Sequence, residues 1–356
     1  MPSIDRTLNG QSRHAIHPPA CVNSMFLIRI FCCLSLLTSF ISQPLYAKEA
    51  TEPTPDIRIA IGDIPGFDTL IVEAAAARAA ERNVHVSISY LQSEDLATQA
   101  IINGLADVGI GTPYALIHNT RAPLRLFYQL NSLRFFPVVD TQHYNDWKDL
   151  DGVPMYTHGE GSGTEAIMML MAREHDIQYS AMHYVPGSGV RAKAMIKGRI
   201  HATIVDTERR NKLLSHPSGK FKTLPTPTIS ASDEALYGHL DFLHTQHAKI
   251  SILVEELIQV SRMINREPNA VVELRDKYNI LHQSTDNKES ALIQMYEELV
   301  SVDAIPNNGG YPTASAADLK FFTASGTLNE NLEQLKDTDF WEFSPLTNAL
   351  GTVGIQ

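Results

Sequence analysis

The sequence contains little cysteine, and all of it lies near the N-terminus. Cys21, Cys32 and Cys33 are the three cysteines among 356 residues. Residues 25–47 combine one arginine, a short apolar run and a final small residue, which is the pattern of a secretory signal peptide. We therefore expect residues 1–47 to be removed, with Met25 as an alternative start. The mature chain would then contain no cysteine, which excludes disulfides, thiolate catalysis and cysteine-ligated metals.

An apolar run long enough to span a bilayer is also lacking. The run at 30–41 is shorter than the roughly 20 residues that a membrane helix needs, and Pro44 follows it. A lipoprotein would have a small residue just before its acceptor cysteine, whereas Phe31 precedes Cys32 and Cys32 precedes Cys33. We therefore expect cleavage after Ala47 and export without an anchor.

Basic residues are too few for a nucleic-acid-binding protein. The chain has 29 lysines and arginines against 40 aspartates and glutamates, a formal net charge of −11. Loss of residues 1–47 removes Arg6, Arg13, Arg29 and Asp5 and leaves 26 basic against 39 acidic residues, a formal net charge of −13. This negative balance excludes nucleic-acid partners.

Motifs of common enzyme and metal sites are missing as well. The glycines around Ser162 lack the lysine of a phosphate-binding loop, and Glu160 and Thr164 stand where a nucleophile elbow has glycines. His239, His244 and His247 are spaced by five and three residues, so they do not share one helix face. No dinucleotide fingerprint occurs. We therefore expect no catalytic residue, no metal and no cofactor.

Short β-branched runs alternate with helical patterns in two sets, which is typical of doubly wound, mostly parallel sheets. We expect a two-lobed α/β protein in which loop-like segments at 141–152 and 222–232 form a two-stranded hinge. The first lobe would comprise residues 56–140 and 228–350, and the second lobe residues 141–227. After about residue 228 we expect helices without strands. The expected strands are IRIAI (57–61), VHVSISY (84–90) and DVGIG (107–111) in the first set, and VPMYT (153–157), AMHYV (181–185) and HATIVD (201–206) in the second.

The glycine-rich stretch THGEGSGTEAIMML (157–170) begins a predicted helix. The first turn of a helix leaves N–H groups unpaired, and glycines let a ligand approach them, so the stretch resembles an anion-binding cradle. Ser162 and Glu165 also have the spacing of a capping box, which would satisfy those donors internally. Both interpretations remain open at this stage.

Three other glycine-bearing loops follow predicted strands, at GDIPGFD (62–68), GTPYAL (111–116) and PGSGVR (186–191). Ligands of open α/β sheets bind beyond the carboxyl ends of the strands, so we expect these loops to meet at one cleft. Arg191 is a candidate counter-ion or a solvated charge, and Phe67 and Tyr114 are candidates for stacking on a ligand or for core packing.

Several stretches taken together resemble the periplasmic substrate-binding proteins of ABC importers, in the branch that binds sulfonates, taurine, nitrate and thiamine-pyrimidine precursors. The resemblance runs from about Asp56 to Leu350. It is carried by DIRIAIGDIPG, NGLADVGIGTPYAL, WKDLDGVPMYTHGEGSGTEAIMML, VPGSGVRAKAMIKGRIHATIVD and DFWEFSPLTNAL.

This resemblance implies a type II periplasmic-binding-protein fold whose two lobes close on a small organic ligand and present it to a membrane permease. The ligand would be an organic anion, such as a sulfonate or carboxylate, or a pyrimidine-type heterocycle, and the protein a periplasmic monomer. The matching ligand-binding residues are Asp63, Phe67, Thr112, Tyr114, Ser162, Gly163, Thr164, Ser188 and Arg191.

Two other functions on the same fold remain open. One is a ligand-binding partner of a sensor system. The other is an enzyme like the thiamine-pyrimidine synthases, although these carry a cysteine-rich motif that the mature chain lacks.

Overall fold

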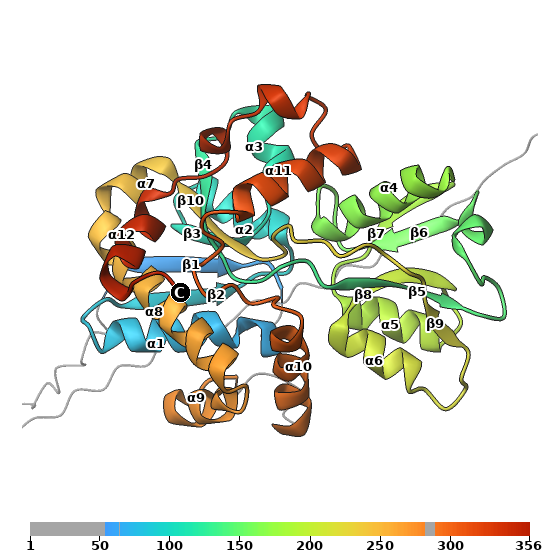
Figure 1. The fold of residues 1–356 in the computed structure, drawn as a ribbon, viewed down its shortest axis with the longest axis horizontal. Helices are drawn as coiled ribbons and strands as arrows, with labels where there is room; N and C mark the ends of the chain where they lie inside the picture. Colours follow the sequence, from blue (N-terminus) through green and yellow to red (C-terminus); the bar gives the residue numbers. More distant parts are fainter. Residues whose placement is uncertain (1–53, 64, 282–288) are drawn as a thin grey trace, which may run out of the picture. The chain divides into compact units, whose positions relative to one another are not determined.

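The computed structural model describes residues 54–63, 65–281 and 289–356, and the predicted signal peptide lies outside these ranges. The described chain forms two α/β lobes (Figure 1). Among the described residues, no helix combines the length and the apolar character needed to cross a membrane.

The first lobe is built on a five-stranded sheet in the order β2–β1–β3–β10–β4. β1 runs parallel to β2 and β3, as the alternation of strands and helices predicts, whereas β10 runs antiparallel to β3 and β4. The strands are β1 (Ile57–Ile61), β2 (Val86–Tyr90), β3 (Val108–Gly111), β4 (Leu124–Gln129) and β10 (Ala235–His239).

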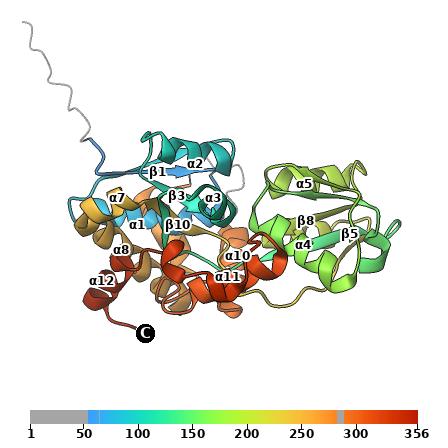
Figure 2. The same ribbon diagram turned by 90° about the horizontal axis from the view of Figure 1, so that it is seen from above.

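Both faces of this sheet are covered by helices. Ile57, Ile59 and Ile61 of β1 join an apolar cluster with α1 and α8, while Ala60 between them joins a second cluster that includes Ala97 of α2. Figure 2 shows α2 and α8 on opposite sides of β1. Burial on both faces explains why four of the five residues of β1 are apolar and why they do not alternate strictly with polar residues.

The second lobe contains an antiparallel ladder in the order β8–β5–β9 and a parallel pair β6–β7. Thr203 on β8 donates a hydrogen bond to the Tyr156 carbonyl on β6 at 2.7 Å, which joins the two groups of strands. The strands are β5 (Phe135–Asp140), β6 (Pro154–Thr157), β7 (Ala181–Tyr184), β8 (Ala202–Asp206) and β9 (Phe221–Thr223).

Two segments cross between the lobes and bond to each other. Ser132 on the outward crossing forms an antiparallel bridge with Ser232 on the return crossing. On either side, the Leu133 amide donates to the Ala231 carbonyl at 2.9 Å and the Asp233 amide donates to the Asn131 carbonyl at 3.0 Å. The expected two-stranded connection between the lobes is therefore present.

The sequence analysis misplaced the outward crossing and missed the strands β5 and β10. Residues 135–140, expected in the first lobe, form β5 and pair with β8 and β9, so the chain crosses at 130–134 and not at 141–152. Pro137 inside this strand argued against a strand. Residues 235–239, expected in an all-helical region, form the interior strand β10. Their sequence, ALYGH, contains Gly238 and no β-branched residue, so the strand pattern is weak.

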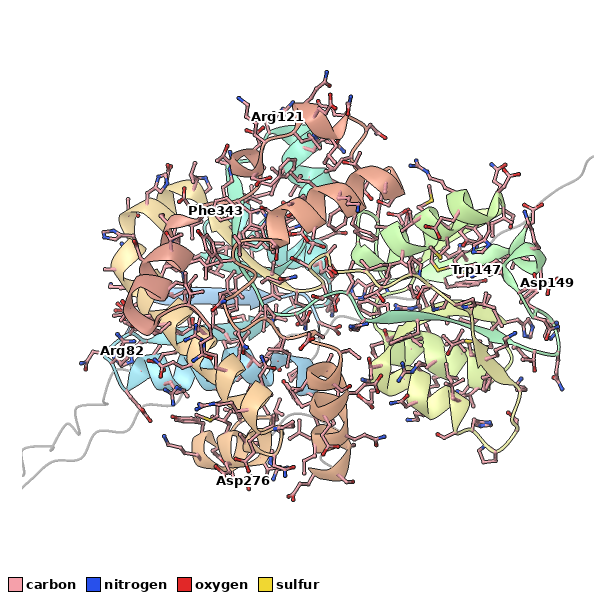
Figure 3. The ribbon with its side chains drawn as sticks, in the orientation of Figure 1. Arg82, Arg121, Trp147, Asp149, Asp276 and Phe343 are labelled. Carbon is pink, nitrogen blue, oxygen red and sulfur yellow. The ribbon has the colours of Figure 1, made fainter. Side chains whose placement is uncertain are left out.

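The longest helix, α8, is fixed to α1 by buried carboxylates. Arg78 donates to Glu256 at 2.7 Å and Arg82, marked in Figure 3, donates to Glu255 at 2.7 Å. The apolar residues of α8 pack between α1 and α12. The helices are α1 (Leu70–Ala80), α2 (Glu94–Ile102), α3 (Tyr114–Thr120), α4 (Gly163–His175), α5 (Ser188–Ile196), α6 (Thr207–Leu214), α7 (Leu240–Thr245), α8 (His247–Arg266), α9 (Ala270–Tyr278), α10 (Glu289–Ser301), α11 (Ala314–Ser325) and α12 (Ser344–Val353), with short 3₁₀ turns η1 (Phe67–Thr69), η2 (Trp147–Leu150), η3 (Leu332–Gln334) and η4 (Asp337–Asp339).

Candidate functional site

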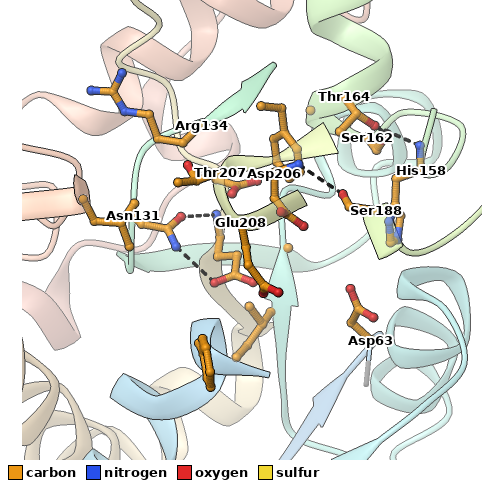
Figure 4. Close-up of a pocket in the computed structure, with 18 of the residues that line it drawn as sticks. Asp63, Asn131, Arg134, His158, Ser162, Thr164, Ser188, Asp206, Thr207 and Glu208 are labelled. Atoms are coloured by element: carbon orange, nitrogen blue, oxygen red, sulfur yellow. Dashed lines mark hydrogen bonds between the residues drawn. The ribbon is translucent and has the colours of Figure 1, made fainter. Parts of the chain in front are cut away.

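A cavity of about 150 Å³ lies where loops after the strands of both lobes face each other (Figure 4). A cavity needs only about 10–15 Å³ to hold one water molecule, so this volume is about tenfold larger and gives room for a small organic molecule. The walls come from the ends of β1, β3 and β8, from the starts of α4 and α5, from the two crossings and from α10. The predicted meeting of strand-end loops is thus confirmed.

Seven of the nine predicted site residues line this cavity, and two do not. Tyr114 and Arg191 are absent from its walls. The seven that line it are Asp63, Phe67, Thr112, Ser162, Gly163, Thr164 and Ser188.

Tyr114 is a core residue and not a stacking platform. Its side chain is fully buried, its hydroxyl donates to Asp318 at 2.6 Å and accepts from the Trp341 indole at 2.7 Å, and its ring stacks on Phe322 with centroids 4.6 Å apart. Burial raises the pKa of Asp318 to about 7, although hydrogen bonds from Ser232, Tyr114 and Trp341 oppose the shift. The tyrosine therefore connects α3 to the C-terminal helices.

Arg191 is also fully buried and serves the second lobe internally. Its guanidinium donates to the Val185 carbonyl at 2.7 Å, to the Ser188 hydroxyl at 3.0 Å and to the Ile204 carbonyl at 3.1 Å. Burial lowers its pKa to about 10, so it stays charged at neutral pH. The arginine holds the start of α5 against the end of β8, and ligand contact was the wrong expectation for it.

The glycine-rich stretch forms a helix start at which side chains of the same stretch accept hydrogen bonds from three backbone amides. Ser162 is the N-cap of α4, and its hydroxyl oxygen accepts from the Glu165 amide at 3.4 Å and from the Gly159 amide at 3.4 Å. Glu165 reaches back to the Gly161 amide at 2.6 Å, one residue from the position that a capping box predicts. The capping interpretation is confirmed, although the Glu165 carboxylate accepts from the Gly161 amide instead of the Ser162 amide.

Other amides near the cavity are paired in the same way. The His158 amide donates to the Thr164 hydroxyl at 3.0 Å, the Gly187 amide to Nδ1 of His158 at 3.4 Å, and the Asp206 amide to the Ser188 hydroxyl at 3.3 Å. Figure 4 shows the first and last of these bonds. Several backbone donors near the two helix starts are therefore bonded to the protein's own side chains.

Sequence reasoning missed most of the acidic residues in the wall. Glu94 at the start of α2, Asp206 and Glu208 after β8, and Asp233 and Glu234 on the return crossing all line the cavity. Removal from water raises the pKa of Glu94; the nearby charges of Asp63 and Asp95 add to this shift, whereas His158, 3.7 Å away, opposes it. Asp206 ends the strand HATIVD and Glu208 follows it, so the strand-end rule that selected the loop containing Asp63 applies to these two residues as well.

One group of side chains outside the cavity has the composition of a metal site. Ligand atoms of Asp140, His143 and His201 lie within 4.8 Å of one another. Nζ of Lys220, however, binds Oδ2 of Asp140 at 2.7 Å. This ammonium group places a positive charge where a metal ion would have to bind.

Comparison with known proteins identifies the fold. No protein-family model and no curated protein matches the sequence. The chain is similar in structure to the nitrate-binding protein NrtA from Synechocystis PCC 6803, with 10% identity, a TM-score of 0.66, and coverage of 84% of this chain and 89% of that one. It is similar to the alkanesulfonate-binding protein SsuA from Xanthomonas axonopodis pv. citri, with 14% identity, a TM-score of 0.59, and coverage of 82% and 99%.

A third similar structure is a Candida albicans protein described as having the generic periplasmic binding protein fold. Its identity is 12%, its TM-score 0.61, and the coverage 84% of this chain and 95% of that one. The chain therefore has the two-lobed periplasmic-binding-protein fold that the sequence motifs predicted.

Proposed function

We propose that the protein is the solute-binding component of an ABC importer, acting as a periplasmic monomer. The observation that carries this proposal is the position of the cavity. It lies between two lobes joined by a pair of mutually bonded crossings, and residues of both lobes form its walls.

A ligand in this position links binding to lobe movement. Asp63 and Thr112 reach the cavity from the first lobe, and Ser162, Thr164 and Ser188 reach it from the second. A solute that contacts both sets stabilises the arrangement in which the lobes are close, and so shifts the population toward that shape. A permease that recognises this shape would receive loaded protein in preference to empty protein.

Thermal denaturation of residues 48–356 with a panel of small solutes tests this proposal. The panel contains sulfonates, carboxylates, pyrimidines and other heterocycles, amines and amidines. Ligand at one hundred times its Kd should add about 2.7 kcal/mol to the free energy of unfolding. A cooperative melt that no solute shifts would count against a solute-binding function.

A matched pair of substitutions tests whether the shift arises in this cavity. Met295 lines the cavity and is only partly buried, whereas Met169 on α4 is exposed outside it. We expect Met295→Trp to fill the cavity and remove the ligand-induced shift, and Met169→Trp to preserve it. A shift that survives Met295→Trp would place the ligand elsewhere.

A further inference from the structure

The wall of the cavity carries far more negative than positive charge. Among the described residues that line it, the cationic groups are Arg134 and Arg209, and His158 is the one histidine. Six carboxylates against two guanidinium groups give the wall a formal charge of −4 when His158 is neutral. The carboxylates belong to Asp63, Glu94, Asp206, Glu208, Asp233 and Glu234.

Both guanidinium groups already contact groups of the protein. Arg209 forms ion pairs with its neighbour Glu208 and, at 3.7 Å, with Asp206. Arg134 donates to the Val302 carbonyl at 2.8 Å. Figure 4 shows the guanidinium of Arg134 turned away from the carboxylates of Asp63 and Glu208. The buried Arg191 behind the wall offsets one negative charge and leaves the balance negative.

A carboxylate of the protein already lies beside the start of α4, where an anion would bind. At the start of α4 the carboxylate of Glu165 accepts from the Gly161 amide, and the Ser162 hydroxyl accepts from the Gly159 amide. An anionic ligand would therefore face the negative charge of Glu165 at the very helix end that usually attracts anions. The helix-start argument and the charge balance of the wall are independent, and both disfavour an anion.

We infer that the ligand of this cavity is a small organic cation, such as an amine, an amidine or a protonated heterocycle, and not a sulfonate, nitrate or carboxylate. This inference rests on the proposed function, because it assigns a ligand class to the same cavity. A partly desolvated cleft lined by one sign of charge concentrates ligands of the opposite sign. The charge of Asp63 also contributes to the raised pKa of Glu94, because it disfavours the ionised form of that carboxyl.

A set of probes of nearly equal shape and different charge tests the inference. Benzamidine, benzamide, benzoate and benzenesulfonate form one set, and agmatine, putrescine and choline extend the cationic arm. Binding to residues 48–356 is measured by calorimetry at two salt concentrations. We expect the cations alone to bind, with affinity that falls as the salt concentration rises.

Substitutions of cavity carboxylates then test whether these groups bind the cation. Asp63→Asn and Glu208→Gln should each weaken cation binding by about tenfold or more, while Glu174→Gln on the exposed surface of α4 should leave it unchanged. Melting without ligand confirms that each variant is folded. Tenfold losses confined to the cavity variants would support the inference.

Two results would overturn the cationic-ligand inference, and they have different consequences for the proposed function. Tighter binding of benzoate or benzenesulfonate than of benzamidine, abolished by Met295→Trp, would show that the cavity takes an anion and would leave the proposed function standing. Cooperative melting with no binding of any probe or of any solute in the wider panel would overturn the proposed function and the cationic ligand with it.

Discussion

Arg210 on α6 of the second lobe donates a hydrogen bond to Glu298 on α10 at 2.5 Å. Asn211 adds a bond to the other carboxylate oxygen at 3.2 Å, and the guanidinium of Arg210 lies 4.0 Å from the centre of the Phe136 ring. Because α10 also carries cavity residues, this ion pair ties the second lobe to the first beside the cavity.

Removing the Arg210–Glu298 ion pair should let the lobes separate. A partly exposed ion pair contributes about 0.5–1 kcal/mol, so Glu298→Gln should shift the distribution of lobe arrangements by a factor of roughly 2–5. We expect a larger radius of gyration by small-angle X-ray scattering without ligand. Asp276→Asn, which removes an ion pair within α9, is the control and should change nothing. Identical scattering from both variants would show that the pair does not hold the lobes.

Gly163 allows α4 to begin against the outward crossing. An added Cβ at this position would lie 2.5 Å from Cδ2 of Leu133, which is buried. We expect Gly163→Ala to cost about 1–3 kcal/mol, because a packed core absorbs an extra methyl group poorly. Leu133→Ala should cost a similar amount alone, and the double variant should be more stable than the sum of the two losses predicts. Additive losses in the free energy of unfolding, measured by urea denaturation, would show that the added methyl group does not meet Leu133.

The buried guanidinium of Arg191 should matter for stability and not for ligand selection. Arg191→Met leaves the Val185 and Ile204 carbonyls without their donor, so we expect a loss of about 3 kcal/mol in the free energy of unfolding. Arg199→Met, at an exposed position nearby, should cost less than about 0.5 kcal/mol. A stable Arg191→Met variant that no longer binds ligand would restore the counter-ion role that we reject.

Asp318 should make the stability depend on pH in an unusual direction. Its pKa is about 7 in the folded protein and about 4 when unfolded, so the folded state binds the extra proton between these values. Stability should therefore fall as pH rises from about 4 to 7, by at most about 4 kcal/mol. Asp318→Asn cannot titrate, so its stability relative to the unsubstituted protein should rise over the same interval. Parallel curves of unfolding free energy against pH would disprove the shift.

The sequence pattern was sufficient for elements whose periodicity is strong. The strands at 57–61 and 201–206 were predicted because β-branched runs alternate with helical segments, and the helix that begins in the glycine-rich stretch was predicted as well. The strands β4, β5, β9 and β10 were not predicted. β5 contains Pro137 and β10 contains Gly238, and both are strands because of the partners that they reach in space, which local propensity does not record.

The residues of the candidate site were likewise predictable only where the sequence carries a local signal. Ser162, Gly163 and Thr164 were found because a helix start after a strand has a local signature. Tyr114 was misjudged because its partners Asp318 and Trp341 are more than 200 residues away in the sequence. The acidic residues Glu94 and Glu234 escaped notice because only the folded chain brings them to the same cavity.

The position of β10 also sets the order in which the chain can fold. β10 separates β3 from β4, yet it is made only after the whole second lobe. Until residues 235–239 are available, the first three strands and β4 have no common sheet to join. The second lobe is one continuous stretch of chain and needs no later strand. The lobe that begins the protein is therefore the last to be completed, and a chain cut at residue 234 should retain a folded second lobe beside an unfinished first one.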